Sequence, residues 1–399
     1  MGGTGESIWS KTFVSLFLVN ALMSMGQMMV NVLIALYADT LGAGTSLVGF
    51  TVSAFAYTAL LLKLISAPAI DAFNRKRILM LSLSALVVAY ALMALSSNIA
   101  MLIVARLLQG SAMAFTTTSC LTMATDTLPP DRISSGIGYY SVAQAACSAV
   151  GPMVGLSFSS AFGYNAAFTL GAVLMTASVA AASIVKEPPH RKRPFKVSLS
   201  GVFAKSTALP ALLAFILSTA FCNVNSFLAL YAAERGVGDS IGWYFTVNAL
   251  LMLVSRPLVG TLADRFGMVR VVLPSICSFA PSFFIISLAD SLPVFLLAAV
   301  FSAFGYGAAA PMIQAYCMKC VPPERRGAGS SAYFIGVDLG NLVGPVTGGF
   351  VAGHVGYAPM WDVMIAPIAV AFLFVLVFRK RISAVERSVV AEGEPSESR

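Results

Sequence analysis

Long apolar stretches alternate with short polar segments along almost the whole chain. Twelve of them are long enough to cross about 30 Å of hydrocarbon as helices that rise about 1.5 Å per residue. Their ends are defined to about four residues. The predicted spans lie near 12–37, 47–69, 78–95, 99–123, 135–160, 166–185, 209–232, 241–262, 271–289, 293–318, 329–352 and 359–379.

A charged, proline-rich segment divides these spans into two sets of six, and such a composition is typical of a linker. The last residues of the chain are polar and acidic, which favours disorder. We therefore expect an N-terminal six-helix bundle over 1–185, a cytoplasmic linker over 186–208, a C-terminal six-helix bundle over 209–381 and a disordered cytoplasmic tail over 382–399.

The two halves repeat each other at a constant offset of 193 residues, which is the separation of Asp71 and Asp264. The same offset relates Gly151-Pro152 to Gly344-Pro345. Such a long register predicts two similarly built halves. Parallel halves in a membrane indicate a site between them that opens to each side in turn.

The composition supports a membrane location. Hydrophobic residues make up 58% of the chain and charged residues 11%, whereas soluble domains carry about 25% charged residues. The mean hydropathy is +0.85. The net charge of +8 could suit nucleic acid, but the cations lie in short loops between apolar runs. Most of them fall inside when both termini are cytoplasmic, which predicts this topology and a lipid bilayer, not nucleic acid, as partner.

Residues for enzyme chemistry are scarce. His190 lies in the linker and His354 in an outer loop, and the sequence has no Ser/His/Asp set and no phosphate-binding loop. Cys317 and Cys320 form a lone Cys-x-x-Cys pair, which does not indicate a metal site by itself. The six cysteines lie in or beside apolar runs, so we expect no disulfide. We expect no enzyme activity, no cofactor and no metal, and transport driven by a gradient.

A loop pattern after the second span of each half suggests a family. The second copy runs from Gly260 through Asp264-Arg265 to Gly267, and the first keeps Asp71 and the basic pair that starts at Arg75. Over nearly its whole length the chain resembles the major facilitator superfamily. This resemblance implies an all-α membrane protein with twelve transmembrane helices in two pseudo-symmetric six-helix bundles. It also implies a gate at Asp71, Arg75, Asp264 and Arg265, where a carboxylate faces a helix N-terminus. The alternative is a topology signal only.

The fourth span carries Arg106 and Gln109, which resemble an intramembrane Arg motif of the family. A mid-membrane Arg costs at least about 2.5–3.5 kcal/mol, so it usually faces a cavity or a partner. A purely structural Arg is the alternative.

Spans five and eleven contain Gly151-Pro152 and Gly344-Pro345, which we expect to take part in gating. Glycine allows close helix packing and proline bends the helix. The copy in span five resembles an antiporter motif and favours export. The copy in span eleven suggests that part of this signal is repeat symmetry.

Polar residues form a stripe on one face of the first span, at Asn20, Ser24, Gln27 and Asn31. A polar stripe in a lipid-embedded helix should face water or protein. The resemblance implies a substrate cavity, and hydrogen bonding between helices is the alternative. The further cavity residues that we predict are Tyr140 and Gln144 in span five, Asn223 and Ser226 in span seven, and Arg256 in span eight.

Charges within the spans predict a coupling site. Lys63 and Asp338 lie at matching depths in the second and eleventh spans, so we expect an ion pair across the halves. Arg256 is the repeat partner of Lys63. We predict that it meets substrate or couples protons, as Arg106 could; snorkelling towards the cytoplasm is the alternative for Arg256.

These features predict a monomeric secondary transporter in the inner or plasma membrane that exports a small organic solute in exchange for protons. Import by proton symport and organic-anion exchange are the alternatives within this class. A receptor or a lipid-handling enzyme would be a different class, but neither needs two equal halves. The first span carries no Asp or Glu, which favours an anionic or zwitterionic solute at least as much as a lipophilic cation.

Overall fold

The computed structural model of the protein describes residues 9–128, 133–185, 205–322 and 326–393. These residues form helices and connecting turns, and twelve segments are long and apolar enough to cross a membrane, as predicted. The helices are α1 (Lys11–Thr40), α2 (Thr45–Ala72), α3 (Arg75–Ala94), α4 (Ile99–Asp126), α5 (Ile133–Phe162), α6 (Tyr164–Ile184), α8 (Ala208–Glu234), α9 (Gly242–Phe266), α10 (Met268–Leu288), α11 (Leu292–Lys319), α12 (Arg326–Val355), α13 (Tyr357–Val363) and α14 (Ile365–Gly393), with 3-10 turns at Lys205–Thr207 and Gly238–Ile241.

The chain forms two compact units. Unit 1 comprises Met1–Ala43 and Ala54–Val197, and unit 2 comprises Gly44–Ser53 and Ser198–Arg399. One boundary falls in the predicted linker over 186–208. The other falls inside the continuous helix α2, whose first residues belong to unit 2.

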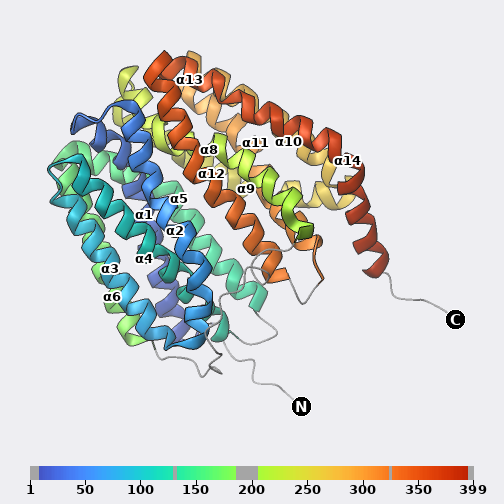
Figure 1. Ribbon diagram of the computed structural model, residues 1–399, viewed down its shortest axis with the longest axis horizontal. Helices are drawn as coiled ribbons and strands as arrows, with labels where there is room; N and C mark the ends of the chain where they lie inside the picture. Colours follow the sequence, from blue (N-terminus) through green and yellow to red (C-terminus); the bar gives the residue numbers. More distant parts are fainter. Residues whose placement is uncertain (1–8, 129–132, 186–204, 323–325, 394–399) are drawn as a thin grey trace. The chain divides into compact units, whose positions relative to one another are not determined.

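In unit 1, α1 packs on α5 and α6, and α3 packs on α4 and α6. Figure 1 shows α3 and α6 side by side. Small residues let these helices approach: a Cβ added at Gly26 would lie 2.7 Å from Cε of Met175, and one at Gly171 would lie 3.2 Å from Cγ2 of Val30. Association of membrane helices depends on such packing because lipid provides no hydrophobic drive between them.

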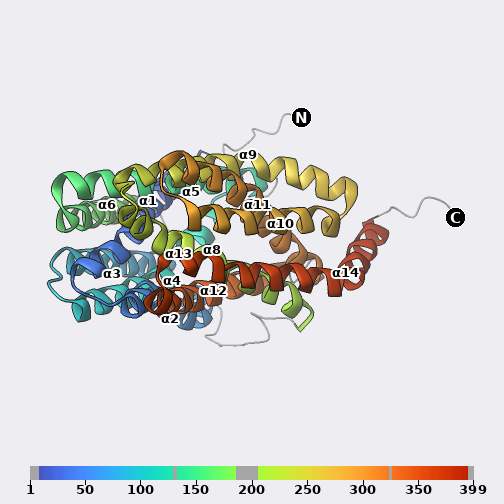
Figure 2. The same cartoon turned by 90° about the horizontal axis from the view of Figure 1, so that it is seen from above.

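In unit 2, α8 packs on α12, and α10 packs on α11 and α14. The neighbouring positions of α10 and α11 can be followed in Figure 2. Buried aromatic rings fill the core: the ring of Trp361 lies 5.7 Å from Phe283 and 6.2 Å from Tyr231 between centroids. The hydroxyl of Tyr231 donates to the carbonyl of Ser287 at 2.7 Å, which satisfies its one polar group inside an apolar core.

The start of α2 lies against α12 within unit 2. A Cβ added at Gly349 would lie 2.6 Å from the carbonyl oxygen of Thr45 and 3.1 Å from Cα of Gly49. A Cβ at Gly49 would overlap the carbonyl of Pro345. Glycines on both helices therefore allow backbone-to-backbone contact at this point.

The last predicted span, 359–379, is divided in the structure into α13 and α14, with the break at Met364. Pro367 has no N–H to donate to the carbonyl of Val363, and its ring clashes with that carbonyl, so α13 ends there. Helix α14 continues to Gly393, past residue 382, where the sequence placed the start of the tail.

Candidate functional site

The guanidinium of Arg106 is buried in unit 1, with 2% of its surface exposed. Its Nη1 donates to Oδ1 of Asn31 at 3.1 Å and to Oε1 of Gln109 at 2.7 Å. Asn31 lies on α1, whereas Gln109 lies one turn along α4 from Arg106. The structure thus brings together three of the predicted site residues, and the bond to Asn31 joins two helices.

Two residues that the sequence analysis did not single out complete this cluster. The amide Nε2 of Gln109 donates to the hydroxyl of Tyr90 on α3 at 3.1 Å. The ring of Phe55 on α2 lies 5.1 Å from Cζ of Arg106, within the range of a cation–π interaction. We call these five residues, Asn31, Phe55, Tyr90, Arg106 and Gln109, the Arg106 cluster.

The local sequence explains how Phe55 reaches this position. A Cβ added at Gly110 would overlap the carbonyl of Phe55 and the hydroxyl of Thr58, so only glycine lets α2 come this close to α4. The hydroxyl of Thr58 also donates to the carbonyl of Leu107 at 2.8 Å. Gly110 and Thr58 thereby hold the aromatic ring beside the guanidinium.

The remaining stripe residues of α1 have different surroundings. Asn20 is buried and its Nδ2 donates to the backbone carbonyl of Tyr140 on α5 at 3.0 Å. This is a hydrogen bond between helices, which was the alternative to a cavity role for the stripe. Ser24 is also buried, whereas Gln27 is half-buried. Gln144, predicted in the same cavity, is exposed on α5.

The predicted polar residues of α8 form local bonds. Asn223 is fully buried, and its Nδ2 donates to the carbonyl of Thr219 at 2.8 Å. Ser226 donates to the carbonyl of Cys222 at 2.8 Å. The Oδ1 atom of Asn223 is buried with no hydrogen-bond partner in the structure, and it occupies the space that a Cβ at Gly348 would fill.

The repeated glycine-proline motifs are close helix contacts in both units. In unit 1, a Cβ at Gly151 of α5 would lie 2.7 Å from Cβ of Met28 on α1. In unit 2, a Cβ at Gly344 of α12 would lie 2.5 Å from the carbonyl oxygen of Thr219 on α8. Pro152 and Pro345 follow directly inside the same helices. The repeat therefore preserves a packing contact, and this packing explains the glycines without reference to direction of transport.

The predicted gate residues are described only in part. Arg75 forms an ion pair with Asp126 at the end of α4, and its Nε donates to the carbonyl of Ile70 at 3.3 Å. Asp126 was not recognised in the sequence because it lies 51 positions from its partner. Arg265 is exposed, with Cζ 5.3 Å from the ring centre of Phe266. The side chains of Asp71, Asp264 and Arg256 lie outside the described residues.

The predicted pair of Lys63 and Asp338 involves both units, and each residue is half-buried. The pair stays a prediction. All six cysteines are free thiols, and the described parts of the chain contain no group of three or more His, Cys, Asp or Glu placed to hold a metal ion.

Comparison with known proteins identifies the class. The model of the Major Facilitator Superfamily matches residues 16–238 and 210–397, so the chain belongs to this superfamily. It is a multi-pass membrane transporter of a small molecule and not an enzyme. The fold predicted from the sequence is therefore confirmed.

Two relatives whose names state an activity are 25% and 30% identical to this chain over the aligned residues. The multi-drug resistance efflux pump PmrA of Streptococcus pneumoniae is 25% identical over 371 residues, covering 88% of this chain and 92% of that protein. The multidrug resistance protein MdtG of Citrobacter koseri is 30% identical over 180 residues, covering 43% of this chain and 44% of that protein. The crystal structure of the nucleoside transporter NupG superposes with a TM-score of 0.74 at 13% identity, over 92% of this chain and 99% of that one.

Proposed function

We propose that the chain exports a small organic solute across the plasma membrane by alternating access, and that entry of protons drives the export. The observation that carries the proposal is the Arg106 cluster. A charge inside the membrane costs at least about 2.5–3.5 kcal/mol, and neutral residues could join α1 to α4 at less cost. The charge of Arg106 therefore has a role in transport: it binds the solute or takes part in coupling solute movement to protons.

The direction of transport is supported by similarity to named relatives, and the orientation of the chain by its charges. The relatives PmrA and MdtG are named as an efflux pump and a multidrug resistance protein. Lys and Arg concentrate in the loops that are inside when both termini are cytoplasmic. This distribution sets the orientation of the chain, and in that orientation export carries the solute from the cytoplasmic side to the outside.

For the proton step we favour Asp338, a carboxyl group within the apolar helix α12. Protonation would cancel its attraction for Lys63, and this change would shift the balance between the two access states. Arg106 cannot readily lose its proton, so its role would be to hold the solute or a counter-charge.

The nature of the solute is suggested by the charges within the spans. The first span carries no Asp or Glu, and two of the residues that accept hydrogen bonds from Arg106, Asn31 and Gln109, are neutral amides. This arrangement favours an anionic or zwitterionic solute over a lipophilic cation. Exchange of organic anions is therefore the second candidate function.

Everted membrane vesicles test the proposal. The lumen is acidified, and uptake of three fluorescent probes, one anionic, one zwitterionic and one cationic, is followed with and without a protonophore. An exporter coupled to protons accumulates a probe in the acidic lumen, and the protonophore abolishes the accumulation. An importer gives no accumulation in the acidic lumen, an anion exchanger works without the pH gradient, and a receptor gives no flux. Arg106→Gln should remove the flux, whereas the exposed Arg235→Gln should retain it.

A further inference from the structure

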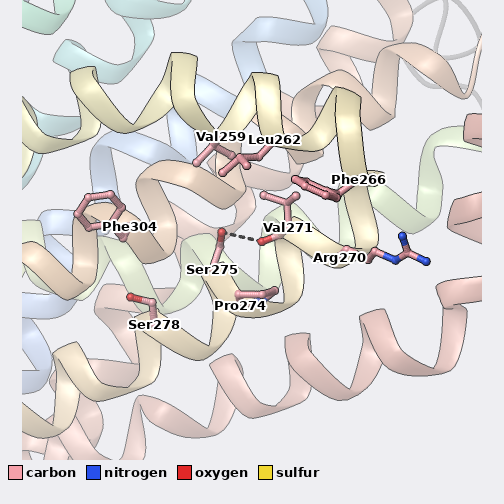
Figure 3. Close-up of a pocket in the computed structure, with 9 residues that line it drawn as sticks. All are labelled: Val259, Leu262, Phe266, Arg270, Val271, Pro274, Ser275, Ser278 and Phe304. Atoms are coloured by element: carbon pink, nitrogen blue, oxygen red, sulfur yellow. Dashed lines mark hydrogen bonds between the residues drawn. The ribbon is translucent and has the colours of Figure 1, made fainter.

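An open groove lies within unit 2 between the end of α9, the start of α10 and the middle of α11. It has a volume of about 440 Å³. Figure 3 shows its lining, with Arg270 at one end and Phe304 at the other. The apolar walls include Leu262, Phe266 and Phe304, which are 45%, 46% and 41% exposed. Apolar side chains this exposed in a membrane-spanning helix have lipid as their natural neighbour.

The groove runs from a helix end towards the membrane interior. Arg270 is in the first turn of α10, and Ser278 lines the groove eight residues further along. At about 1.5 Å per residue this is about 12 Å of depth. One end of the groove therefore lies at the level of lipid headgroups and the other at the level of acyl chains.

The charged residue that lines the headgroup end is a cation. Among the nine described residues that line the groove, Arg270 is a cation and none is acidic. Arg265 lies nearby, with its guanidinium over the ring of Phe266, which is itself part of the wall. Guanidinium groups bind phosphate with paired hydrogen bonds, so this end suits an anionic headgroup.

The hydroxyl groups deeper in the groove already have partners. Ser275 donates to the carbonyl of Val271 at 2.9 Å, and Ser278 donates to the carbonyl of Phe301 at 3.2 Å. A polar molecule would find few donors there, whereas an acyl chain needs none. Pro274 in the wall cannot donate to the carbonyl of Arg270, so that carbonyl lacks its usual helical donor beside the guanidinium.

From these observations we infer that the groove is a binding site for one anionic phospholipid, with its phosphate on Arg270 and an acyl chain along Leu262, Phe266 and Phe304. A headgroup with hydroxyls, such as that of phosphatidylglycerol, can also donate to the carbonyl of Arg270. This site is separate from the Arg106 cluster, which lies in unit 1, and it does not depend on the direction of transport.

The internal repeat provides a matched control. Arg77 of α3 is the repeat partner of Arg270, and it is also exposed in the first turn of its helix. Its neighbours differ at the same offset: Leu81 stands where unit 2 has Pro274, and Ser111 where it has Phe304. Arg77→Gln removes the same charge at the corresponding position without changing the groove.

The test uses purified full-length protein with Leu262→Trp as a reporter in the wall of the groove. Quenching by phosphatidylglycerol with brominated acyl chains is compared with quenching by brominated phosphatidylcholine, and the signal of the three native tryptophans is subtracted using protein without the reporter. We expect phosphatidylglycerol to bind about fivefold more tightly, because one Arg near an anionic lipid contributes about 1 kcal/mol. Arg270→Gln should bring the preference within about twofold, and Arg270→Lys and Arg77→Gln should retain most of it.

Three results would overturn the inference: equal quenching by the two lipids, a preference that survives Arg270→Gln, or an equal loss in Arg77→Gln, which would indicate a general surface-charge effect. Melting temperatures of the variants show that each is folded. Native mass spectrometry of the wild-type protein gives an independent check, since it should retain one phosphatidylglycerol after phosphatidylcholine is removed.

Discussion

The amide oxygen of Asn31 on α1 accepts a hydrogen bond of 3.1 Å from the guanidinium of Arg106 on α4. This bond attaches a buried charge to a second helix, and Gln109 holds the same nitrogen at 2.7 Å from within α4. The charge is thereby fixed in one place. A fixed charge in a site of low dielectric interacts more strongly with an opposite charge than it would in water.

Replacing Asn31 by Leu should lower transport by at least about fivefold. The change removes one acceptor from a buried cation, at a cost of about 1–3 kcal/mol, and a loss of 1.4 kcal/mol is about tenfold. The exposed Asn165→Leu on α6 is the control and should transport normally. Flux at equal protein levels measures both. Normal flux in Asn31→Leu would show that the bond is only structural.

Gly344→Ala should destabilise the protein, whereas Gly260→Ala should not. A Cβ at Gly344 lies too close to the carbonyl of Thr219, and overpacking costs about 1–3 kcal/mol. Nothing lies within 4 Å of a Cβ at Gly260, so alanine there should stabilise α9 by about 0.5–1 kcal/mol. Thermal unfolding in detergent separates the two. Equal melting temperatures would contradict the packing account of the repeated motif.

The effects of substitutions at Lys63 and Asp338 on transport should be coupled. Lys63→Ala and Asp338→Ala should each reduce flux strongly, and Lys63→Asp combined with Asp338→Lys should recover part of it. In a double-mutant cycle, two residues that interact commonly show a coupling free energy of about 0.5–3 kcal/mol. The exposed Asp290→Asn is a control for loss of an acid elsewhere in unit 2. Additive losses with no recovery would exclude the pair.

The sequence was sufficient for the fold because its signals are local and repeated. Twelve apolar runs define the spans, and the offset from Asp71 to Asp264 defines two halves. The break at Met364 was missed although its cause, Pro367, is visible in the sequence, because the run from 359 to 379 is apolar throughout.

The site was only partly predictable. Arg106 and Gln109 share a helix face at a spacing of three, which the sequence shows directly. Their bonds to Asn31 and Tyr90 depend on how α1, α3 and α4 pack, and no local pattern encodes that packing. Tyr90 had one available signal, a phenol inside an otherwise apolar run, since a buried hydroxyl usually has a partner. The pairing of Arg75 with Asp126 depends on packing in the same way.

The central claim, that the chain works by alternating access, is tested most directly by fixing α2 to α12. The Cβ of Thr45 lies 3.8 Å from a Cβ built at Gly353, a separation that suits a disulfide, and the rest of α2 belongs to unit 1. The control is Val30→Cys with Gly171→Cys, which joins α1 to α6 inside unit 1. Both pairs are oxidised in proteoliposomes, and flux is measured before and after reduction.

The account predicts that oxidised Thr45→Cys/Gly353→Cys protein has no flux and that a reductant restores it. With the start of α2 bonded covalently to α12 of unit 2, helix α2 can no longer move together with unit 1. The control pair should transport in both states. Full cross-linking of Thr45→Cys with Gly353→Cys and undiminished flux would contradict alternating access by movement of the two units.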